Sequence, residues 1–134
     1  MTRTYSGSCH CQAVRFEVNL NLQAGTTRCN CSICTKARLW NAYVKATDLR
    51  IVAGQAVLSE YRFNRRSMQY YFCRICGVRL FAYINSDMLE DKFVSVQVNT
   101  LDDLEPQELL SAPIRYINGR QNKWWQQPQF TKHL

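Results

Sequence analysis

Seven cysteines fall in three tight clusters of this 134-residue chain, and none lies outside them. The clusters have the patterns C-x-C, C-x-C-x-x-C and C-x-x-C, and their members are Cys9 and Cys11; Cys29, Cys31 and Cys34; and Cys73 and Cys76. Zinc takes four thiolates in a closed structural site, or three protein ligands and one exchangeable position in a catalytic site. Because seven is four plus three, the count predicts two zinc ions per chain, one structural and one open to chemistry.

A disulfide framework is the alternative use of these thiols. An odd count leaves one thiol unpaired, and the opening residues MTRTYSGSCHC contain no apolar run typical of a secretory signal peptide. Reduced thiols in the cytosol more often bind metals or catalyse reactions than form disulfides. We therefore expect zinc ligands and a cytoplasmic location.

Spacing alone leaves two ways to divide the cysteines between two metals. In the first, the two outer clusters form the closed site and the middle cluster forms the open one. In the second, the C-x-x-C halves of the middle and last clusters form a ribbon-like site, which leaves Cys9, Cys11 and Cys29. A triplet within six residues can build a three-thiolate site locally, which favours the first division without excluding the second.

The bulk properties are those of an ordinary globular domain, and we expect one domain over residues 1–134. Hydrophobic residues make up 46% and charged residues 20% of the chain, and no stretch approaches the roughly 20 apolar residues of a membrane span. The formal charge of +7 counts each cysteine as a neutral thiol. Seven thiolates and two Zn²⁺ would lower it to +4, so a nucleic-acid partner is not indicated by charge.

The elements that must position these cysteines are mostly short strands with alternating or apolar runs. We expect strands at 13–20, 42–44, 49–52, 56–63, 67–73, 78–84 and 93–99. Short helical segments are expected at 32–38 and within 101–110, followed by an irregular C-terminal tail. The last cysteine pair joins two strands as a hairpin, and Gly77 after it can adopt a positive φ that turns backbone N–H groups toward sulfur.

Several segments carry a family resemblance. The stretch SGSCHCQAVRFEV at 6–18 resembles the opening of the glutathione-dependent formaldehyde-activating enzyme family, which includes centromere protein V. The segment CNCSICTK at 29–36 is similar to the centromere protein V branch, and YRF at 61–63, FCRICG at 72–77 and VQVNTLDD at 96–103 continue the pattern. The resemblance covers about residues 5–104, with a weaker match at 117–119.

The resemblance implies the first division of the cysteines. A structural zinc would be bound by Cys9, Cys11, Cys73 and Cys76, and a catalytic zinc by Cys29, Cys31 and Cys34. The implied fold is mainly β, a β-tent of small antiparallel sheets organised around the structural Cys₄ zinc, with few short helices. The implied activity is that of a carbon–sulfur lyase acting on S-hydroxymethylglutathione, which forms from glutathione and formaldehyde.

Other residues could serve a catalytic zinc site. A free fourth position would let the metal hold an incoming thiol as a thiolate or polarise an aldehyde, whereas His10, His133 or a carboxylate would close it. Arginine and lysine would bind the carboxylates of glutathione. The candidates for that binding are Lys36, Arg38, Arg62, Arg65 and Arg66, and Trp40, Trp124 and Trp125 could form a pocket wall.

Two short segments depart from the family pattern near the expected second metal. Leu39-Trp40 stands where a glycine-containing segment is common, and Val78-Arg79 stands where smaller or polar residues are common. The rival interpretation is a non-catalytic zinc module whose basic residues contact nucleic acid or a protein partner. The resemblance implies a small-molecule thiol, glutathione, and an aldehyde as partners. Because no recognition helix and no membrane-length apolar stretch are visible, we expect no nucleic acid and no membrane as partners.

Overall fold

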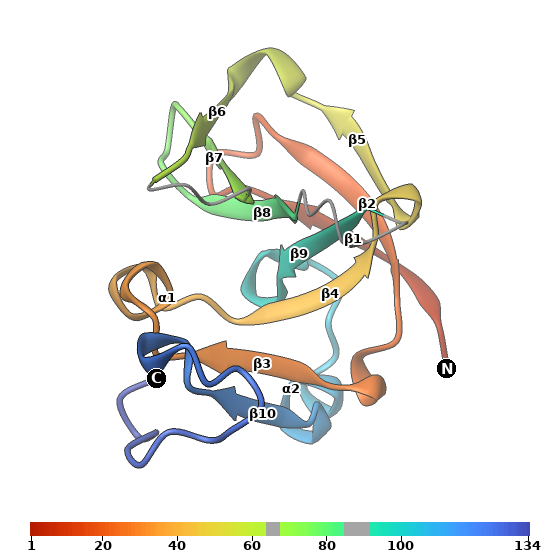
Figure 1. Ribbon diagram of the computed structural model, residues 1–134. Coiled ribbons are helices and arrows are strands. Elements are labelled where there is room, and N and C mark those ends of the chain that lie inside the picture. Colours follow the sequence, from red (N-terminus) through yellow and green to blue (C-terminus); the bar gives the residue numbers. More distant parts are fainter. Residues whose placement is uncertain (64–67, 85–91) are drawn as a thin grey trace.

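A smaller antiparallel sheet, a larger mixed sheet and the turns between them make up most of the computed structural model, which describes residues 1–63, 68–84 and 92–134 (Figure 1). The smaller sheet has the strand order β1-β2-β5 and the larger one β10-β3-β4-β9-β8-β7-β6. The strands are β1 Arg3–Ser8, β2 Arg15–Leu20, β3 Thr26–Cys29, β4 Asn41–Lys45, β5 Leu49–Ala53, β6 Leu58–Tyr61, β7 Met68–Cys73, β8 Arg79–Ile84, β9 Phe93–Gln97 and β10 Ile114–Ile117.

The helical elements in the described residues are short. The two α-helices are α1 Ser32–Ala37 and α2 Pro106–Ser111. Single 3₁₀ turns are η1 Leu22–Ala24, η2 Ala46–Asp48, η3 Gln55–Val57, η4 Val98–Thr100 and η5 Gly119–Gln121. None of these helices has the length and apolar character needed to cross a membrane. The prediction of a mainly β fold of small sheets with few short helices is confirmed.

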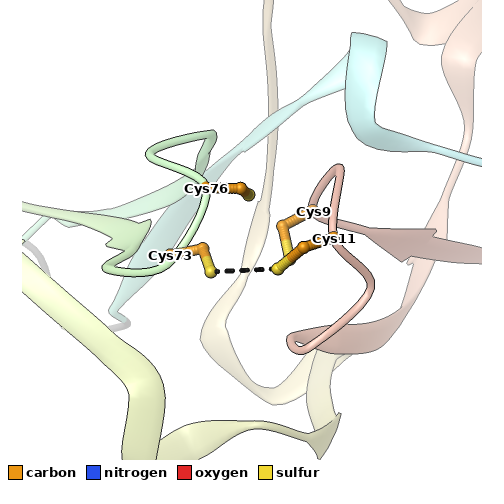
Figure 2. A group of neighbouring side chains, drawn as sticks. All are labelled: Cys9, Cys11, Cys73 and Cys76. Atoms are coloured by element: carbon orange, nitrogen blue, oxygen red, sulfur yellow. Dashed lines mark hydrogen bonds between the residues drawn. The ribbon is translucent and has the colours of Figure 1, made fainter.

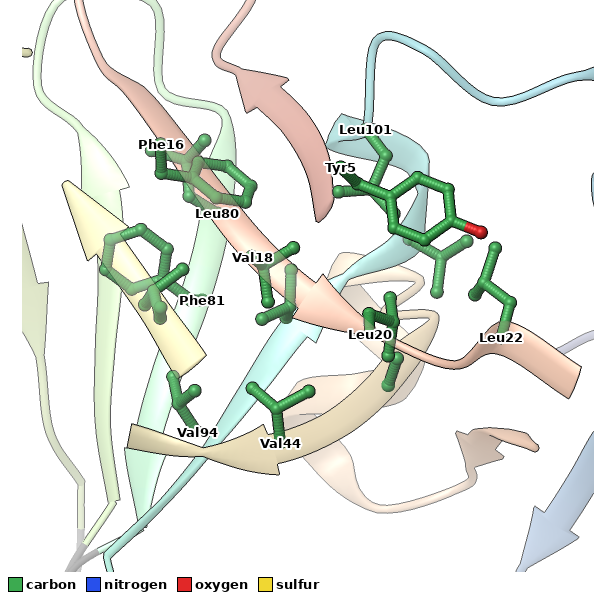
Figure 3. Packing of buried hydrophobic residues seen from close by; sticks show 14 of the residues in the cluster. Tyr5, Phe16, Val18, Leu20, Leu22, Val44, Leu80, Phe81, Val94 and Leu101 are labelled. Atoms are coloured by element: carbon green, nitrogen blue, oxygen red, sulfur yellow. The ribbon is translucent and has the colours of Figure 1, made fainter. Parts of the chain in front are cut away.

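The hydrophobic core lies where the smaller sheet packs against one face of the larger one (Figure 3). Strand β2 contributes Phe16 and Val18, whose alternation in the sequence places both on the buried face. The Phe16 ring meets Phe81 of β8 edge-on, with centroids 5.6 Å apart. Each such fully buried apolar side chain stabilises the fold by about 1.5–3 kcal/mol.

A second apolar layer covers the opposite face of the larger sheet. It contains all three cysteines of the middle cluster together with Leu39, Tyr70, Ala82 and Ile117. Because both faces of the sheet are covered, β9 is buried at consecutive positions, from Val94 through Gln97. The middle cysteines and the outer ones therefore lie on opposite sides of the larger sheet's central strands.

Strand β10 forms in the tail that the sequence pattern predicted to be irregular. It pairs in parallel with β3, from Ile114 beside Thr26 to Ile117 beside Cys29. The pairing brings the C-terminal segment next to α1 (Figure 1). The segment is only four residues long, and its first two residues are exposed, so the pairing with β3 rather than burial of an alternating face defines this strand.

Candidate metal centres and active site

The two outer clusters meet in one place, which we call the four-cysteine site: Cys9, Cys11, Cys73 and Cys76. Figure 2 shows the four side chains converging from two turns, one between β1 and β2 and the other between β7 and β8. Their sulfurs all lie within 4.8 Å of one another, with Cys11 Sγ 3.6 Å from Cys9 Sγ and 3.7 Å from Cys73 Sγ. Thiolates about 2.3 Å from a tetrahedral zinc are about 3.8 Å apart, so the arrangement fits that ion.

Backbone N–H groups surround these sulfurs. Gly77 has φ +79°, as the C-x-x-C-G pattern predicts, and this conformation closes the tight turn after Cys76. Backbone hydrogen bonds from Cys11 and Val78 lower the pKa of the Cys76 thiol to about 6. The N–H of Val14 also donates to Cys9 Sγ at 3.3 Å. Such donors stabilise thiolates, which are the form that binds metals.

The middle cluster forms a second group, the three-cysteine site: Cys29, Cys31 and Cys34. Cys29 ends β3, Cys31 precedes the first turn of α1, and Cys34 lies within that helix. Their sulfurs lie within 4.8 Å of one another, and no His, Cys, Asp or Glu elsewhere in the described residues joins them. The donor set therefore fits zinc with one position left for another ligand.

Hydrogen bonds distribute charge within the three-cysteine site. The side chains of Cys29 and then Cys34 donate toward Cys31 and lower the pKa of its thiol to about 2. The pKa of Cys34 is raised because it shares its proton with Cys29 and Cys31 and because it is buried. These hydrogen bonds favour the thiolate form of Cys31, which is the form that binds metals.

A buried polar layer supports the three-cysteine site from the sheet below it. Asn41 Oδ1 on β4 accepts hydrogen bonds from Ser95 Oγ and from Gln97 Nε2 on β9, both at 2.8 Å. Asn41 Nδ2 lies 4.0 Å from Cys34 Sγ, and Gln97 Oε1 accepts from the backbone N–H of Trp40 at 2.9 Å. These side chains fix the loop that follows α1.

The sequence analysis missed this layer. Ser95 and Gln97 alternate with valines along β9, a pattern that is typical of a strand with one solvent-exposed face. Both are buried because the three-cysteine site covers that face.

Comparison with known proteins places the chain in a family. The family model described as glutathione-dependent formaldehyde-activating enzyme matches residues 4–117. The chain belongs to this family. A crystal structure of a Rhodobacter sphaeroides protein matches with a TM-score of 0.68 and 33% sequence identity, over 82% of this chain and 99% of that one.

The structure places the lysine and arginine candidates for carboxylate binding in different surroundings. Arg62 pairs with Glu60 at 3.3 Å, and Arg38 donates to the carbonyl of His133 at 3.5 Å. Lys36 is exposed on α1. Arg65 and Arg66 lie outside the described residues. None of the three described cations lines the cavity beside the three-cysteine site.

The histidine candidates for metal binding and the tryptophan candidates for a pocket wall also differ in their surroundings. His10 and His133 are exposed, and neither joins a cysteine group. Trp40 donates from Nε1 to Thr26 Oγ1 at 2.7 Å and has a structural role. Trp124 is near enough to Gly119 that a Cβ there would touch its ring, whereas Trp125 is 75% exposed.

The two departures from the family pattern meet in space. Leu39 and the pair Val78-Arg79 line one cavity of about 290 Å³, which Gln97 also lines. Arg79 Nη1 is buried there and has no hydrogen-bond partner among the described residues. This cavity is close to both cysteine sites, because Gly77 follows Cys76 and Leu39 packs with the middle cluster.

Proposed function

We propose that this chain is a zinc-dependent enzyme of the carbon–sulfur lyase type that adds glutathione, or a related thiol, to formaldehyde or a similar small aldehyde. The observation that carries the proposal is the three-cysteine site. It offers three sulfurs, no fourth protein ligand in the described residues, and a cavity of about 170 Å³ that Cys31 lines. Membership of the glutathione-dependent formaldehyde-activating family supports the same substrates.

The reaction is an addition in which atoms and electrons balance. The thiol sulfur forms a bond to the aldehyde carbon, the carbon–oxygen π bond breaks, and the oxygen gains the proton that the thiol loses. A zinc ion bound by Cys29, Cys31 and Cys34 would supply Lewis acidity and lower the pKa of a thiol placed beside it. We propose these three residues as the ligands of that catalytic zinc, and two zinc ions per chain.

The protein's own residues hold the site in place. The backbone N–H of Cys31 donates to Cys29 Sγ at 3.3 Å, and the amide of Asn41 approaches Cys34 Sγ. Groups of this kind orient metal ligands, and their loss commonly lowers metal affinity roughly 10- to 100-fold. Burial of the cluster beneath Leu39, Tyr70 and Ile117 limits its contact with water.

We propose a structural role for the four-cysteine site. It connects the β1–β2 turn to the β7–β8 turn, so a zinc bound there would link the smaller sheet to the larger one. The cysteines come from segments 62 residues apart, as Cys11 and Cys73 illustrate. Metal binding that joins distant segments contributes directly to the free energy of folding.

The test is the rate of exchange among formaldehyde, glutathione and S-hydroxymethylglutathione at equilibrium. Exchange NMR should show faster interconversion with the zinc-loaded protein than without it, and the matched Cys31→Ser protein should return the rate to background. Because the uncatalysed reaction also proceeds, the excess rate per enzyme is the quantity to measure. No excess with the native protein would overturn this substrate pair.

A non-catalytic zinc module that contacts nucleic acid is the second candidate. Its support is the exposed Trp125 and Phe130, which lie in a segment with Lys123 and Lys132 and no acidic residue. Base stacking on exposed aromatic side chains next to cations is a common mode of single-strand binding. Submicromolar affinity for oligonucleotides that falls steeply with salt would favour this candidate. Absence of such binding would reject it.

A further inference from the structure

A small cavity at the three-cysteine site is built partly from the C-terminal segment. The cavity has a volume of about 170 Å³. Its lining residues are Cys31, Ser32, Phe63, Gly119, Arg120 and Asn122. The last three come from a segment nearly 90 residues away in the sequence and beyond the residues that the family model matches. Arg120 and Asn122 therefore lie beyond both the match of the family model and the weaker family-like match at 117–119.

Hydrogen bonds attach this segment to the loop between Cys29 and Cys31. The backbone N–H of Arg120 donates to Asn30 Oδ1 at 2.9 Å, and Arg120 Nε donates to the Asn30 carbonyl at 3.2 Å. Asn30 Nδ2 in turn donates to Asn118 Oδ1 at 3.0 Å. Asn30 thus couples the position of Arg120 to the cysteines on either side of it.

The position of Gly119 shows how closely the segment approaches the sulfurs. A Cβ at this buried residue would lie 2.6 Å from Cys29 Sγ, which no side chain could tolerate without displacement. Glycine therefore permits the backbone to lie directly against the cluster. The next residue, Arg120, is consequently held at the edge of the cluster.

The orientation of the Arg120 guanidinium leaves its outer edge available. Nε is engaged by the Asn30 carbonyl, while the two terminal nitrogens make no hydrogen bond or ion pair with any part of the chain that the structure describes. A guanidinium whose two terminal nitrogens are free matches a carboxylate in a two-bond arrangement. The geometry at this cavity thus suits a carboxylate ligand.

The charge around the site also favours an anion. Residues 18–47 and 109–134, which include β3, α1, β4, β10 and the C-terminal segment, contain no Asp or Glu. They contain eight of the seventeen Lys and Arg residues: Arg28, Lys36, Arg38, Lys45, Arg115, Arg120, Lys123 and Lys132. Three thiolates with one Zn²⁺ have a net charge of about −1, so an anionic thiol would be repelled without nearby cations.

We propose that Arg120 is the specificity-determining residue of this site, which binds a carboxylate of the thiol substrate and selects thiols that carry one. The inference rests on the proposed function, because it takes the three-cysteine site as the place where the thiol reacts. Arg120 binds substrate and takes no part in proton transfer. Arg38 and Arg62, expected for this role from the sequence, are engaged elsewhere.

The test measures binding separately from turnover. S-methylglutathione keeps both carboxylates but has no free thiol, and its diethyl ester has no free carboxylate. Titration of the zinc-loaded protein, followed by calorimetry or by amide NMR shifts, should show tighter binding of the acid, and Arg120→Gln should weaken that binding roughly 10- to 100-fold while leaving ester binding unchanged. Arg115→Gln is the matched control, because Arg115 is exposed on β10 and lines a different cavity.

The outcomes separate the two proposals. An Arg120→Gln protein that binds S-methylglutathione within twofold of the native protein, or an equal loss in Arg115→Gln, would overturn the role of Arg120. Binding that depends on Arg120 in a protein without excess exchange activity would reject the lyase but retain the anion site. In an active protein, Arg120→Gln should raise KM for glutathione by a larger factor than it raises KM for 2-mercaptoethanol, which has no carboxylate.

A variant that folds poorly does not end the test. Zinc content and circular dichroism identify such a variant, and Arg120→Lys, which keeps the charge but loses the planar pair of donors, should then give an intermediate affinity. A comparison of the two ligands on the native protein tests the proposal without any variant. Equal affinity for S-methylglutathione and its diethyl ester would overturn the proposal without any substitution.

Discussion

The two cysteine sites of this protein use the same side chain in different settings. The four-cysteine site gathers two pairs from distant turns and connects the two sheets, whereas the three-cysteine site comes from six consecutive residues at the end of β3 and the start of α1. The first offers a full tetrahedral set, and the second offers three sulfurs beside a cavity. From this difference we expect that a zinc joining distant segments would stabilise the fold, whereas a zinc held locally could be lost with the fold intact.

Cys73→Ser gives the largest expected effect and tests the first half of this comparison. Cys73 is fully buried between the sheets, and structural zinc sites contribute apparent free energies of about 10–16 kcal/mol, as much as a whole domain's stability. We expect an unfolded or precipitated protein. Circular dichroism and urea unfolding measure the outcome, and a soluble, cooperatively folded Cys73→Ser protein would contradict the structural assignment.

Cys31→Ser tests the second half. Because Cys31 belongs to a local cluster at the surface of the larger sheet, the substitution should remove one zinc per chain and abolish catalysis while the fold survives. Native mass spectrometry and elemental analysis count the zinc, with the native protein as the comparison. If Cys31→Ser instead melts the whole domain, the two sites have been assigned the wrong way round.

Asn41→Ala has an intermediate expected effect. The substitution leaves Ser95 Oγ and Gln97 Nε2 buried without their shared acceptor, which should lower the free energy of unfolding by about 1–3 kcal/mol. Metal affinity of the three-cysteine site should also fall by roughly tenfold or more. Competition with a zinc chelator measures that affinity, and the exposed Asn99 provides the control Asn99→Ala. Unchanged affinity would mean that the polar layer has no role in the site.

Glu108→Gln has the smallest expected effect and lies far from both sites. Hydrogen bonds from Arg3, then from the backbone at Glu105 and from Tyr5, lower the pKa of Glu108 to about 2, below its ordinary value of 4.5. The carboxylate therefore stabilises the fold above about pH 4.5, and this contribution is lost as pH falls toward 2. The Tm of Glu108→Gln should be lower than that of the native protein by a constant amount from pH 5 to 8. If the Tm difference between the two proteins changed between pH 5 and 8, the lowered pKa of Glu108 would be contradicted.

Much of the fold could be predicted from local pattern. The expected strands at 13–20, 67–73, 78–84 and 93–99 correspond to β2, β7, β8 and β9, because alternating or apolar runs encode which face is buried. Strands β1, β3 and β10 were not predicted. Strands β1 and β3 have few apolar residues, and β10 has only four residues with the first two exposed; each pairs with another strand of the fold.

The sequence by itself determined the chemistry: seven thiols in clusters whose spacing suits zinc, with Gly77 placed for the turn that follows them. Local spacing suffices for this because ligands of one cluster are only a few bonds apart. Only the tertiary structure decided which clusters meet, that both faces of β9 are buried, and that Arg120 lies beside Cys31. These depend on contacts between segments tens of residues apart, which no local pattern encodes.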